Sequence, residues 1–221
     1  MKSQGGIIMN NKVYLCIDLK SFYASVECVE RGLDPFKINL VVADPTRGGG
    51  AITLAATPAI KQLGVPSRGR IYEIPKDIEY ITATPRMTLY MKYSAKIYSI
   101  FLKFISSEDI HVYSIDESFL DITSYLSLYK MNAKQLAKTI IDEIYNVTGI
   151  TATVGIGTNL FLAKVALDIT AKHAKDFMGY LDEDLFKQLI WHHTPITDVW
   201  MIGPGTANRL ASLGIKDLYG V

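Results

Sequence analysis

Short apolar runs alternate with amphipathic stretches along most of the chain. The run Val13–Leu19 is largely apolar, which predicts a buried strand. Ser21 follows it at a position suited to cap a helix. In that helix Phe22, Val26 and Val29 share one face. The first predicted unit is therefore a strand that leads directly into a helix.

The region from residue 38 to residue 64 repeats this arrangement with more turn chemistry. Ile38–Ala43 is strand-like, and Asp44–Gly50 contains a proline and consecutive glycines, which are typical of a turn. Ala51–Leu63 predicts a strand that runs into a helix, with Pro58 near the helix start and Gly64 just past its end.

A long amphipathic helix is predicted over Arg86–Ile105, because apolar side chains recur there on one face. After it, Val112–Ile115 and Phe119–Ile122 flank the segment Asp116-Glu117-Ser118. Two strand-like runs so close together predict a tight hairpin. The hairpin would carry acidic residues at its tip.

The remaining pattern completes an α+β fold. Helices are predicted over Ala133–Val147 and Asn159–Lys172, with the strand Thr151–Gly157 between them. Further short helices are predicted over Asp182–Trp191, with Asp182 as the cap, and over Asp198–Leu213, as a pair joined by Ile202-Gly203-Pro204-Gly205. The order of elements favours an antiparallel or mixed sheet backed by helices.

Composition narrows the class of protein. The 221 residues are 49% apolar and 20% charged, which is typical of a globular protein with one large domain or two small ones. The net charge of +1 gives no support to nucleic-acid binding, so that function must rest on local sites. Cys16 and Cys28 form no CxxC pair, which favours a reduced cytoplasmic protein. No apolar run predicts a membrane span, and Met1–Asn11 is interpreted as a loose leader.

Three carboxylates stand out by their positions, because Asp18 ends an apolar strand while Asp116 and Glu117 occupy the hairpin tip. Carboxylates at the edge of a buried sheet suggest Mg²⁺, which takes oxygen ligands. Two such ions can clamp the attacking and leaving oxygens of a phosphoryl transfer. An alternative stays open, in which Asp18 caps the next helix and the other two form a polar turn. Asp121, nearby, is interpreted as a structural partner.

The start of the helix after Asp18 offers a second kind of site. Free backbone amides and partial positive charge make a helix start favourable for phosphate. The turn Lys20–Tyr23 would therefore lie beside the predicted metal site.

Four segments together resemble the Y-family DNA polymerases, in that family's order and spacing. They are Ile17–Glu27 (IDLKSFYASVE), Tyr113–Asp121 (YSIDESFLD), Val154–Lys164 (VGIGTNLFLAK) and Ile202–Gly205 followed by Leu213-Gly214-Ile215. The nearest subgroup is that of the UmuC/ImpB-like bacterial repair polymerases. A nucleotide cyclase, which shares the palm fold, is disfavoured because the hairpin lacks a GG[DE]EF pattern.

The resemblance implies a ferredoxin-like polymerase palm with an inserted small fingers domain and a partial helical thumb that contains a helix-hairpin-helix. The implied division is a leader at 1–11, palm at 12–30 and 78–172, fingers at 31–77 and thumb at 173–221. The C-terminal DNA-gripping domain of the family is expected to be absent. A natural truncation, a gene fragment and a shortened protein all remain open as the origin of the chain's end.

The resemblance also implies ligands for two Mg²⁺ ions. By matched position these are the carboxylates of Asp18, Asp116 and Glu117 and the backbone carbonyl of Leu19. In the family these carboxylates carry catalysis.

Nucleotide contacts follow from the same match. Ser21, Phe22, Tyr23 and Lys61 would bind the incoming nucleotide. The ring of Tyr23 would be the steric gate, lying where a ribose 2′-hydroxyl would go and excluding it by clash. Small residues of the fingers would leave room for damaged template bases.

The chain departs from the family's triphosphate contacts. A usual tyrosine and arginine are replaced by Pro58 and Lys61, and Lys61 offers a point charge rather than a bidentate fork. The third motif has Asn159-Leu160 where Asn-Lys is common, although Lys164 is near in sequence.

DNA contacts are implied in the thumb. Gly203 and Gly205 would let backbone amides approach a DNA phosphate, although a plain helical turn needs glycine too.

The implied function is error-prone translesion synthesis in DNA repair, in which a dNTP is joined to a primer 3′-hydroxyl. The implied partners are damaged primer-template DNA, dNTP, and a sliding clamp or SOS accessory proteins, with no membrane involved. The alternative is an inactive DNA-binding or regulatory remnant of such a polymerase. A cytoplasmic location is expected.

Overall fold

The computed structural model describes residues 12–221, so the predicted leader lies outside the described residues. Contacts divide the chain into two compact units. Of the described residues, the first unit comprises Lys12–Cys16, Phe119–Ala137 and Val154–Val221. The second unit comprises Ile17–Ser118 and Lys138–Thr153.

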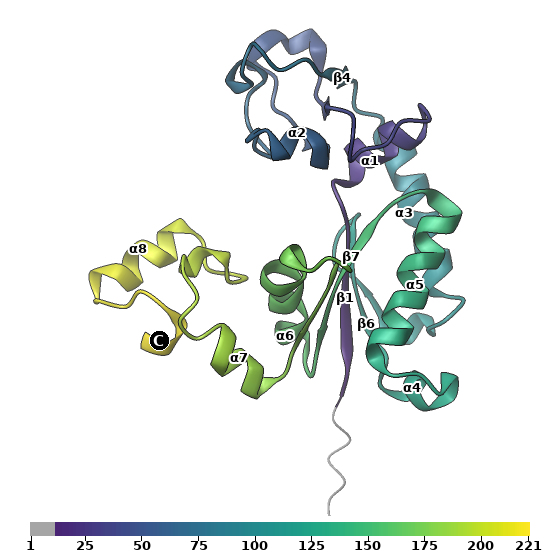
Figure 1. Ribbon diagram of the computed structural model, residues 1–221, viewed down its shortest axis with the longest axis vertical. Coiled ribbons are helices and arrows are strands. Elements are labelled where there is room, and N and C mark those ends of the chain that lie inside the picture. The colour runs from purple at the N-terminus through teal and green to yellow at the C-terminus, as the bar shows by residue number, and fades with distance from the viewer. Residues whose placement is uncertain (1–11) are drawn as a thin grey trace, which may run out of the picture. The chain divides into compact units, whose positions relative to one another are not determined.

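A five-stranded sheet runs in the order β5-β6-β1-β7-β8 (Figure 1). Its strands are β1 (Tyr14–Leu19), β5 (Ile110–Val112), β6 (Glu117–Asp121), β7 (Ala152–Gly157) and β8 (Met178–Leu181). The strands β7 and β8 are parallel, and Val154 pairs with Met178. The predicted strands at 13–19 and 151–157 are confirmed. The predicted mixed α/β architecture is confirmed with them.

The acidic hairpin differs from the prediction in where its tip lies. The amides of Tyr113 and Ser114 both donate to the carbonyl of Glu117 at 3.0 Å, which closes the turn just before that residue. Glu117 and Ser118 therefore belong to strand β6 and are 8% and 7% exposed. Of the predicted tip residues, only Asp116 remains in the turn.

A second, three-stranded sheet lies in the second unit, in the order β3-β2-β4. Its strands and the helix beside it are β2 (Leu40–Val42), β3 (Ala55–Ala56), β4 (Ile81–Ala83) and α2 (Pro58–Gln62). β2 pairs with β3 in the antiparallel and with β4 in the parallel sense. Val41, Ala56 and Ile60 form the centre of a small core there. Pro58 opens α2 and Gly64 follows its end at φ +86°, as predicted.

Two helices of the second unit were predicted and are present: α1 (Phe22–Val29) and α3 (Met87–Phe101). The helix α3 ends before the predicted limit, where the amides of Lys103 and Phe104 donate to carbonyls three residues back, those of Ile100 and Phe101. The predicted helix at 133–147 is also present, as α5 (Ala133–Thr148).

In the first unit, the single helix predicted over 159–172 is divided into three. It comprises α6 (Leu160–Val165), a π-helical turn at Ala166–Thr170 and a 3₁₀ turn at Ala171–His173. The hydroxyl of Thr170 donates to the carbonyl of Ala166 at 2.8 Å within the π segment. The apolar periodicity of the segment does not distinguish π and 3₁₀ turns from an α-helix, so it could not predict the division.

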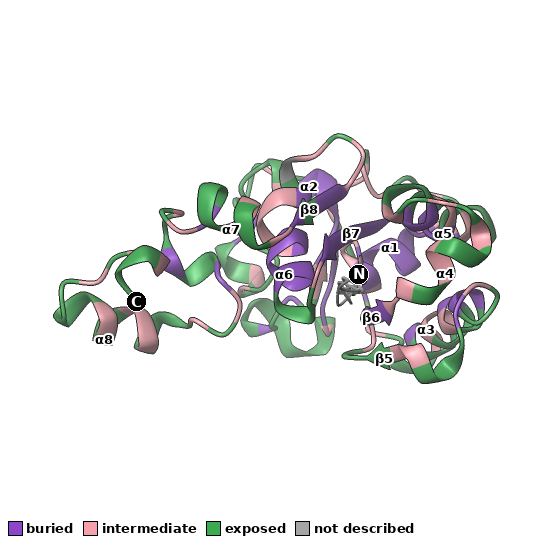
Figure 2. Cartoon of the chain, turned by 90° about the horizontal axis from the view of Figure 1, so that it is seen from below, coloured by how far each residue is buried: buried purple, intermediate pink, exposed green. Residues whose placement is uncertain are grey.

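The last part of the chain contains α7 (Glu183–Leu189) and α8 (Pro204–Ser212). Asp182 caps α7 as predicted, because its side chain accepts from the amide of Leu185 at 2.8 Å. The predicted pair of helices over 198–213 is wrong in its first member, since only a 3₁₀ turn at Ile196–Asp198 precedes α8. The helix α4 (Thr123–Tyr129) was not predicted. Figure 2 shows α8 with intermediate and exposed residues, in contrast to the mostly buried α1.

The structure also bears on the state of the two cysteines and on membrane spans. Both cysteines are buried and neither forms a disulfide bond, and burial raises the pKa of the Cys28 thiol to about 11. Within residues 12–221, no helix has the length and hydrophobicity of a membrane span.

Candidate active site

The strands β1 and β6 place two of the predicted acidic residues at opposite positions of the sheet. The amide of Leu19 donates to the carbonyl of Asp116 at 2.9 Å, and the amide of Ile122 donates to the carbonyl of Val13 at 2.9 Å. Bonds in this register place Asp18 directly opposite Glu117 in an antiparallel ladder, as a pair without hydrogen bonds between its backbones. Such pairs lie on one face of the sheet with their Cα atoms about 4.5 Å apart.

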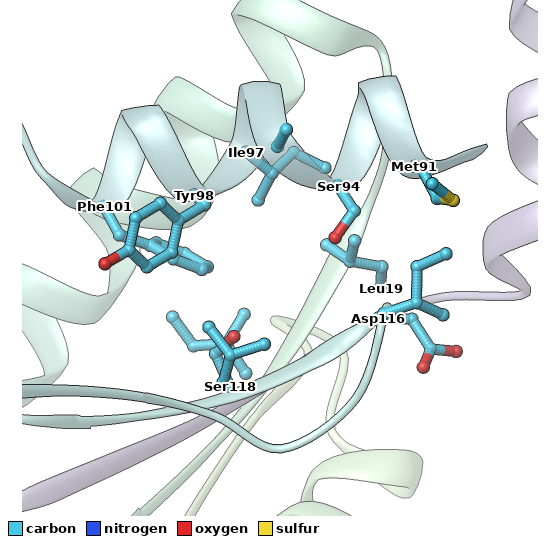
Figure 3. A pocket seen from close by; sticks show the side chains of 12 residues that line it. Leu19, Met91, Ser94, Ile97, Tyr98, Phe101, Asp116 and Ser118 are labelled. Carbon is cyan, nitrogen blue, oxygen red and sulfur yellow. The ribbon is translucent and has the colours of Figure 1, made fainter. Parts of the chain in front are cut away.

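Asp116 lies in the turn, one residue before the strand. Its backbone is fixed by the bond to Leu19, and the hydroxyl of Ser114 donates to its Oδ1 at 2.7 Å. Figure 3 shows its carboxylate directed away from α3 at the open end of a pocket. The turn therefore brings a third carboxylate to the end of the two strands that carry Asp18 and Glu117.

The donor set suits a hard divalent cation, because it offers three carboxylates from adjacent positions and backbone carbonyls. The three carboxylate side chains do not converge on one point, however. Among the described residues, no three His, Cys, Asp or Glu side chains are close enough to hold a metal ion. The fold thus supplies the ligands on adjoining strands, while their convergence on an ion remains a prediction.

The pocket in Figure 3 lies between α3 and the strands β1 and β6 and has a volume of about 350 Å³. Its walls are mostly apolar, with Ser94, Tyr98, Asp116 and Ser118 as the residues that carry polar side-chain atoms. Ile17 and Leu19 line it too, so this is the face of β1 opposite to Asp18.

Tyr23 lies in the first turn of α1 and is half-buried. Its ring stacks on Tyr90 of α3, with centroids 4.4 Å apart and planes 14° apart. Burial raises the pKa of Tyr23, and the charge of Asp116 raises it further, while the positive charge of Arg68 opposes the rise. The charge of Asp116 therefore acts on Tyr23, while the role of Tyr23 as a steric gate stays a prediction.

Ser21 does not cap α1 with its side chain, which corrects the prediction. Its backbone is left-handed (φ 51°), and its hydroxyl instead accepts a hydrogen bond from Nζ of Lys61 at 2.8 Å. This bond joins two of the predicted nucleotide-binding residues across 40 positions of sequence. Phe22, another of these predicted residues, is 2% exposed, so its side chain is part of the core.

One buried charged residue near Tyr23 was given no role by the sequence, although it ends the first motif. The carboxylate of Glu27 is fully buried and forms ion pairs with Arg31 and Arg86. Burial alone would raise the pKa of Glu27, but hydrogen bonds from Arg86, Arg31 and Tyr90 hold it below its usual value. Only the fold reveals this cluster, because Glu27 and Tyr90 are 63 positions apart.

Other predicted residues lie in the first unit. Asn159 caps α6, since its side chain accepts from the amide of Leu162 at 2.8 Å. Lys164 is 8% exposed and forms an ion pair with Asp168 at 3.2 Å. Gly203 precedes α8 and Gly205 lies in its first turn, and no atom is within 4 Å of where a Cβ would stand on either. The backbone there is open to close approach.

Comparison with known proteins decides the family. A model of the impB/mucB/samB family matches residues 17–168, a range that contains Asp18, Asp116 and Glu117. The chain belongs to the impB/mucB/samB family. The resemblance to Y-family DNA polymerases of the UmuC/ImpB type is thereby confirmed.

Relatives agree with this assignment. The putative UV-damage repair protein UvrX of Bacillus subtilis is 36% identical over 208 residues, which cover 94% of this chain and 49% of UvrX. DNA polymerase IV 2 of Bacillus subtilis is 34% identical over 215 residues, which cover 97% of this chain and 51% of the relative. The chain spans about half the length of the curated relatives it matches.

Solved structures share the fold. The insertion ternary complex of Dbh DNA polymerase superposes with a TM-score of 0.77 at 26% identity, covering 93% of this chain and 58% of the polymerase. Family membership and fold thus agree that this chain corresponds to part of a Y-family polymerase.

Proposed function

We propose that the chain is the catalytic portion of an error-prone translesion DNA polymerase. It would join a dNTP to a primer 3′-hydroxyl opposite a damaged template base. The observation that carries the proposal is the pairing of Asp18 with Glu117 on adjacent strands, with Asp116 in the turn beside them. The relatives named as DNA polymerases support it.

The carboxylates of Asp18, Asp116 and Glu117 and the carbonyl of Leu19 would hold two Mg²⁺ ions. Bound there, the ions supply positive charge to the attacking and leaving oxygens of the transfer. The protein's part would be to hold the carboxylates in place, and for Asp116 the backbone bond from Leu19 and the bond from the Ser114 hydroxyl support that role.

The first turn of α1 and Lys61 would bind the triphosphate. Lys61 replaces the family's arginine, and its bond to Ser21 places its ammonium group at the start of α1. Helix amides and a lysine together favour a phosphate group at that position. Arg68 offers a second positive charge, because it is close enough to affect the pKa of Tyr23. Tyr23 would exclude the ribose 2′-hydroxyl as the steric gate.

The proposed domain division assigns 12–30 and 78–172 to the palm, 31–77 to the fingers and 173–221 to part of the thumb. The exposed backbone of Gly203 and Gly205 would contact a phosphate of the primer-template duplex. A sliding clamp or SOS accessory proteins would assist the polymerase at a stalled fork.

A primer-extension assay with Mg²⁺ and high enzyme concentration tests the proposal. We expect template-directed extension by the wild-type chain and its loss in Asp116→Ala, because that variant lacks one carboxylate of the metal site. Asp121→Asn is the matched control. Asp121 lies on the same strand but bonds to Thr123 and Lys12, so the variant should keep extension.

Two results would refute the proposal. One is extension by folded Asp116→Ala at the wild-type rate. The other is complete inactivity of the wild-type chain at saturating DNA and dNTP, which would favour an inactive remnant.

A further inference from the structure

The tyrosine proposed as the steric gate is held from behind by a second tyrosine. The ring of Tyr90 stacks on Tyr23 and is itself 0% exposed. Phe22 contacts Tyr23 from the neighbouring position, with centroids 5.8 Å apart and planes tilted by 46°. Because stacked rings lie face against face in nearly parallel planes, any shift of Tyr90 displaces the surface against which Tyr23 rests.

Tyr90 is fixed in turn by a buried carboxylate. Its hydroxyl donates to Oε1 of Glu27 at 2.7 Å. Glu27 also accepts from Arg86, at 2.9 Å from Nε to Oε1 and 2.7 Å from Nη2 to Oε2, and from Arg31. Its side chain is 0% exposed, and charge-assisted bonds of this kind are shorter and stronger than neutral ones. A fully bonded buried group of this kind has little freedom to move.

Glu27 and Tyr23 also share one helix. They are four positions apart on α1, so they lie on the same face. The carboxylate of Glu27 therefore accepts from the hydroxyl of Tyr90, while the ring of Tyr23 packs on the ring of Tyr90.

We propose that Glu27 is a positioning residue for sugar selection, which acts on Tyr23 through Tyr90. This inference rests on the proposed function, from which its substrate, a deoxyribonucleotide, is taken. A gate that works by clash depends steeply on the position of its ring, and misplacement by about 1 Å can cost an enzyme on the order of 100-fold in rate. The two arginines keep Glu27 charged, and the charged carboxylate accepts the Tyr90 hydrogen bond.

The chain contains a matched control for this arrangement. Tyr93 donates to Glu30 at 2.8 Å, so a second tyrosine–glutamate pair joins the same two helices. That pair is exposed, and Tyr93 lies one helical turn away from Tyr90. Removal of the Tyr93 hydroxyl tests the loss of such a bond without disturbing the Tyr90 ring.

The experiment compares incorporation of dNTP and rNTP by wild type, Glu27→Gln, Tyr90→Phe and Tyr93→Phe, with Tyr23→Ala as the positive control. We expect Tyr90→Phe and Glu27→Gln to lower the dNTP preference in kcat/KM by about twofold to tenfold, the range of a perturbed aromatic pair. Tyr93→Phe should keep the preference of the wild type, and Tyr23→Ala should lose most of it. Unchanged preference in folded Tyr90→Phe and Glu27→Gln would overturn the inference.

A second readout does not need activity. In protein labelled with 3-fluorotyrosine, the ¹⁹F signal assigned through Tyr23→Phe should shift or broaden in Glu27→Gln and remain unchanged in Tyr93→Phe. Inactivity of the wild type would refute the proposed function, while this signal would still decide whether Glu27 positions Tyr23. A Tyr23 signal identical in wild type and Glu27→Gln would refute the positioning role.

Discussion

At the scale of single residues, Glu27 shows how a buried negative charge is stabilised. Its carboxylate is removed from water, which is costly, and it is stabilised by two guanidinium groups and a phenol. The guanidinium groups are 36% and 44% exposed, so solvent screens part of their attraction. Loss of the carboxylate would leave both arginines without their partner and Tyr90 without its acceptor.

We therefore expect Glu27→Ala to lower the free energy of unfolding by about 3 kcal/mol, the lower end for a broken buried ion pair. The pH dependence follows from the lowered pKa of Glu27. A carboxyl whose pKa is lower in the folded state stabilises the protein fully above its unfolded pKa, and the contribution is lost as pH falls through the folded value.

Urea unfolding from pH 7 down to pH 3 measures both effects. The wild type should lose more stability than Glu27→Gln below the ordinary glutamate pKa of 4.5. Parallel pH profiles for the two proteins would contradict this assignment.

Motifs predicted the residues that touch the proposed chemistry, because Asp18, Tyr23 and the hairpin acids lie in short conspicuous segments. The motifs could not predict the residues that hold these side chains in position. The Glu27–Tyr90 bond joins distant helices and has no local pattern. Ser21 was predicted to cap α1 because it stands at the right position, but its left-handed backbone and its bond to Lys61 direct the hydroxyl elsewhere.

At the scale of elements, β7 and the helix after it pack at backbone distance. A Cβ on Gly155 would lie 2.0 Å from the carbonyl oxygen of Ala163 and 2.3 Å from the amide of Leu167. Only glycine allows this approach, because the obstacle is main chain and cannot turn aside. The π turn begins at Ala166, so Leu167 makes this contact from within the turn.

Gly155→Ala should therefore destabilise the protein by about 3 kcal/mol, the upper end for overpacking. Gly205→Ala is the control, because no atom lies within 4 Å of its Cβ position and alanine favours the helix α8. Thermal unfolding of both variants measures the difference. Equal melting temperatures would contradict the proposed backbone contact.

The long helices were the elements that the sequence predicted best. The helices α3 and α5 carry several turns of apolar periodicity, and both were predicted within a few residues. The strand β4 has three residues, two of them exposed, so it offered no alternation to detect. The strand β8 is held by its parallel pairing with β7, which is a long-range contact.

At the scale of the whole molecule, near-neutral charge limits DNA binding. The net charge is +1, so few phosphates can be neutralised by excess basic residues. We expect this 221-residue chain to bind primer-template DNA with a Kd weaker than about 1 μM at physiological salt, the range of non-specific binding. Fluorescence anisotropy across a salt series measures the affinity. Nanomolar binding with a steep salt dependence would contradict the expectation.

The central claim is that Asp18, Asp116 and Glu117 form one divalent-cation site. Titration of Mn²⁺ followed by electron paramagnetic resonance, with dNTP present, tests it most directly, since Mn²⁺ shares the oxygen-ligand preference of Mg²⁺. We predict that Asp18→Asn and Glu117→Gln each weaken Mn²⁺ binding by at least about tenfold, on the scale of disrupted metal sites, while Asp121→Asn binds like the wild type. Equal Mn²⁺ affinity in all four proteins would contradict the account.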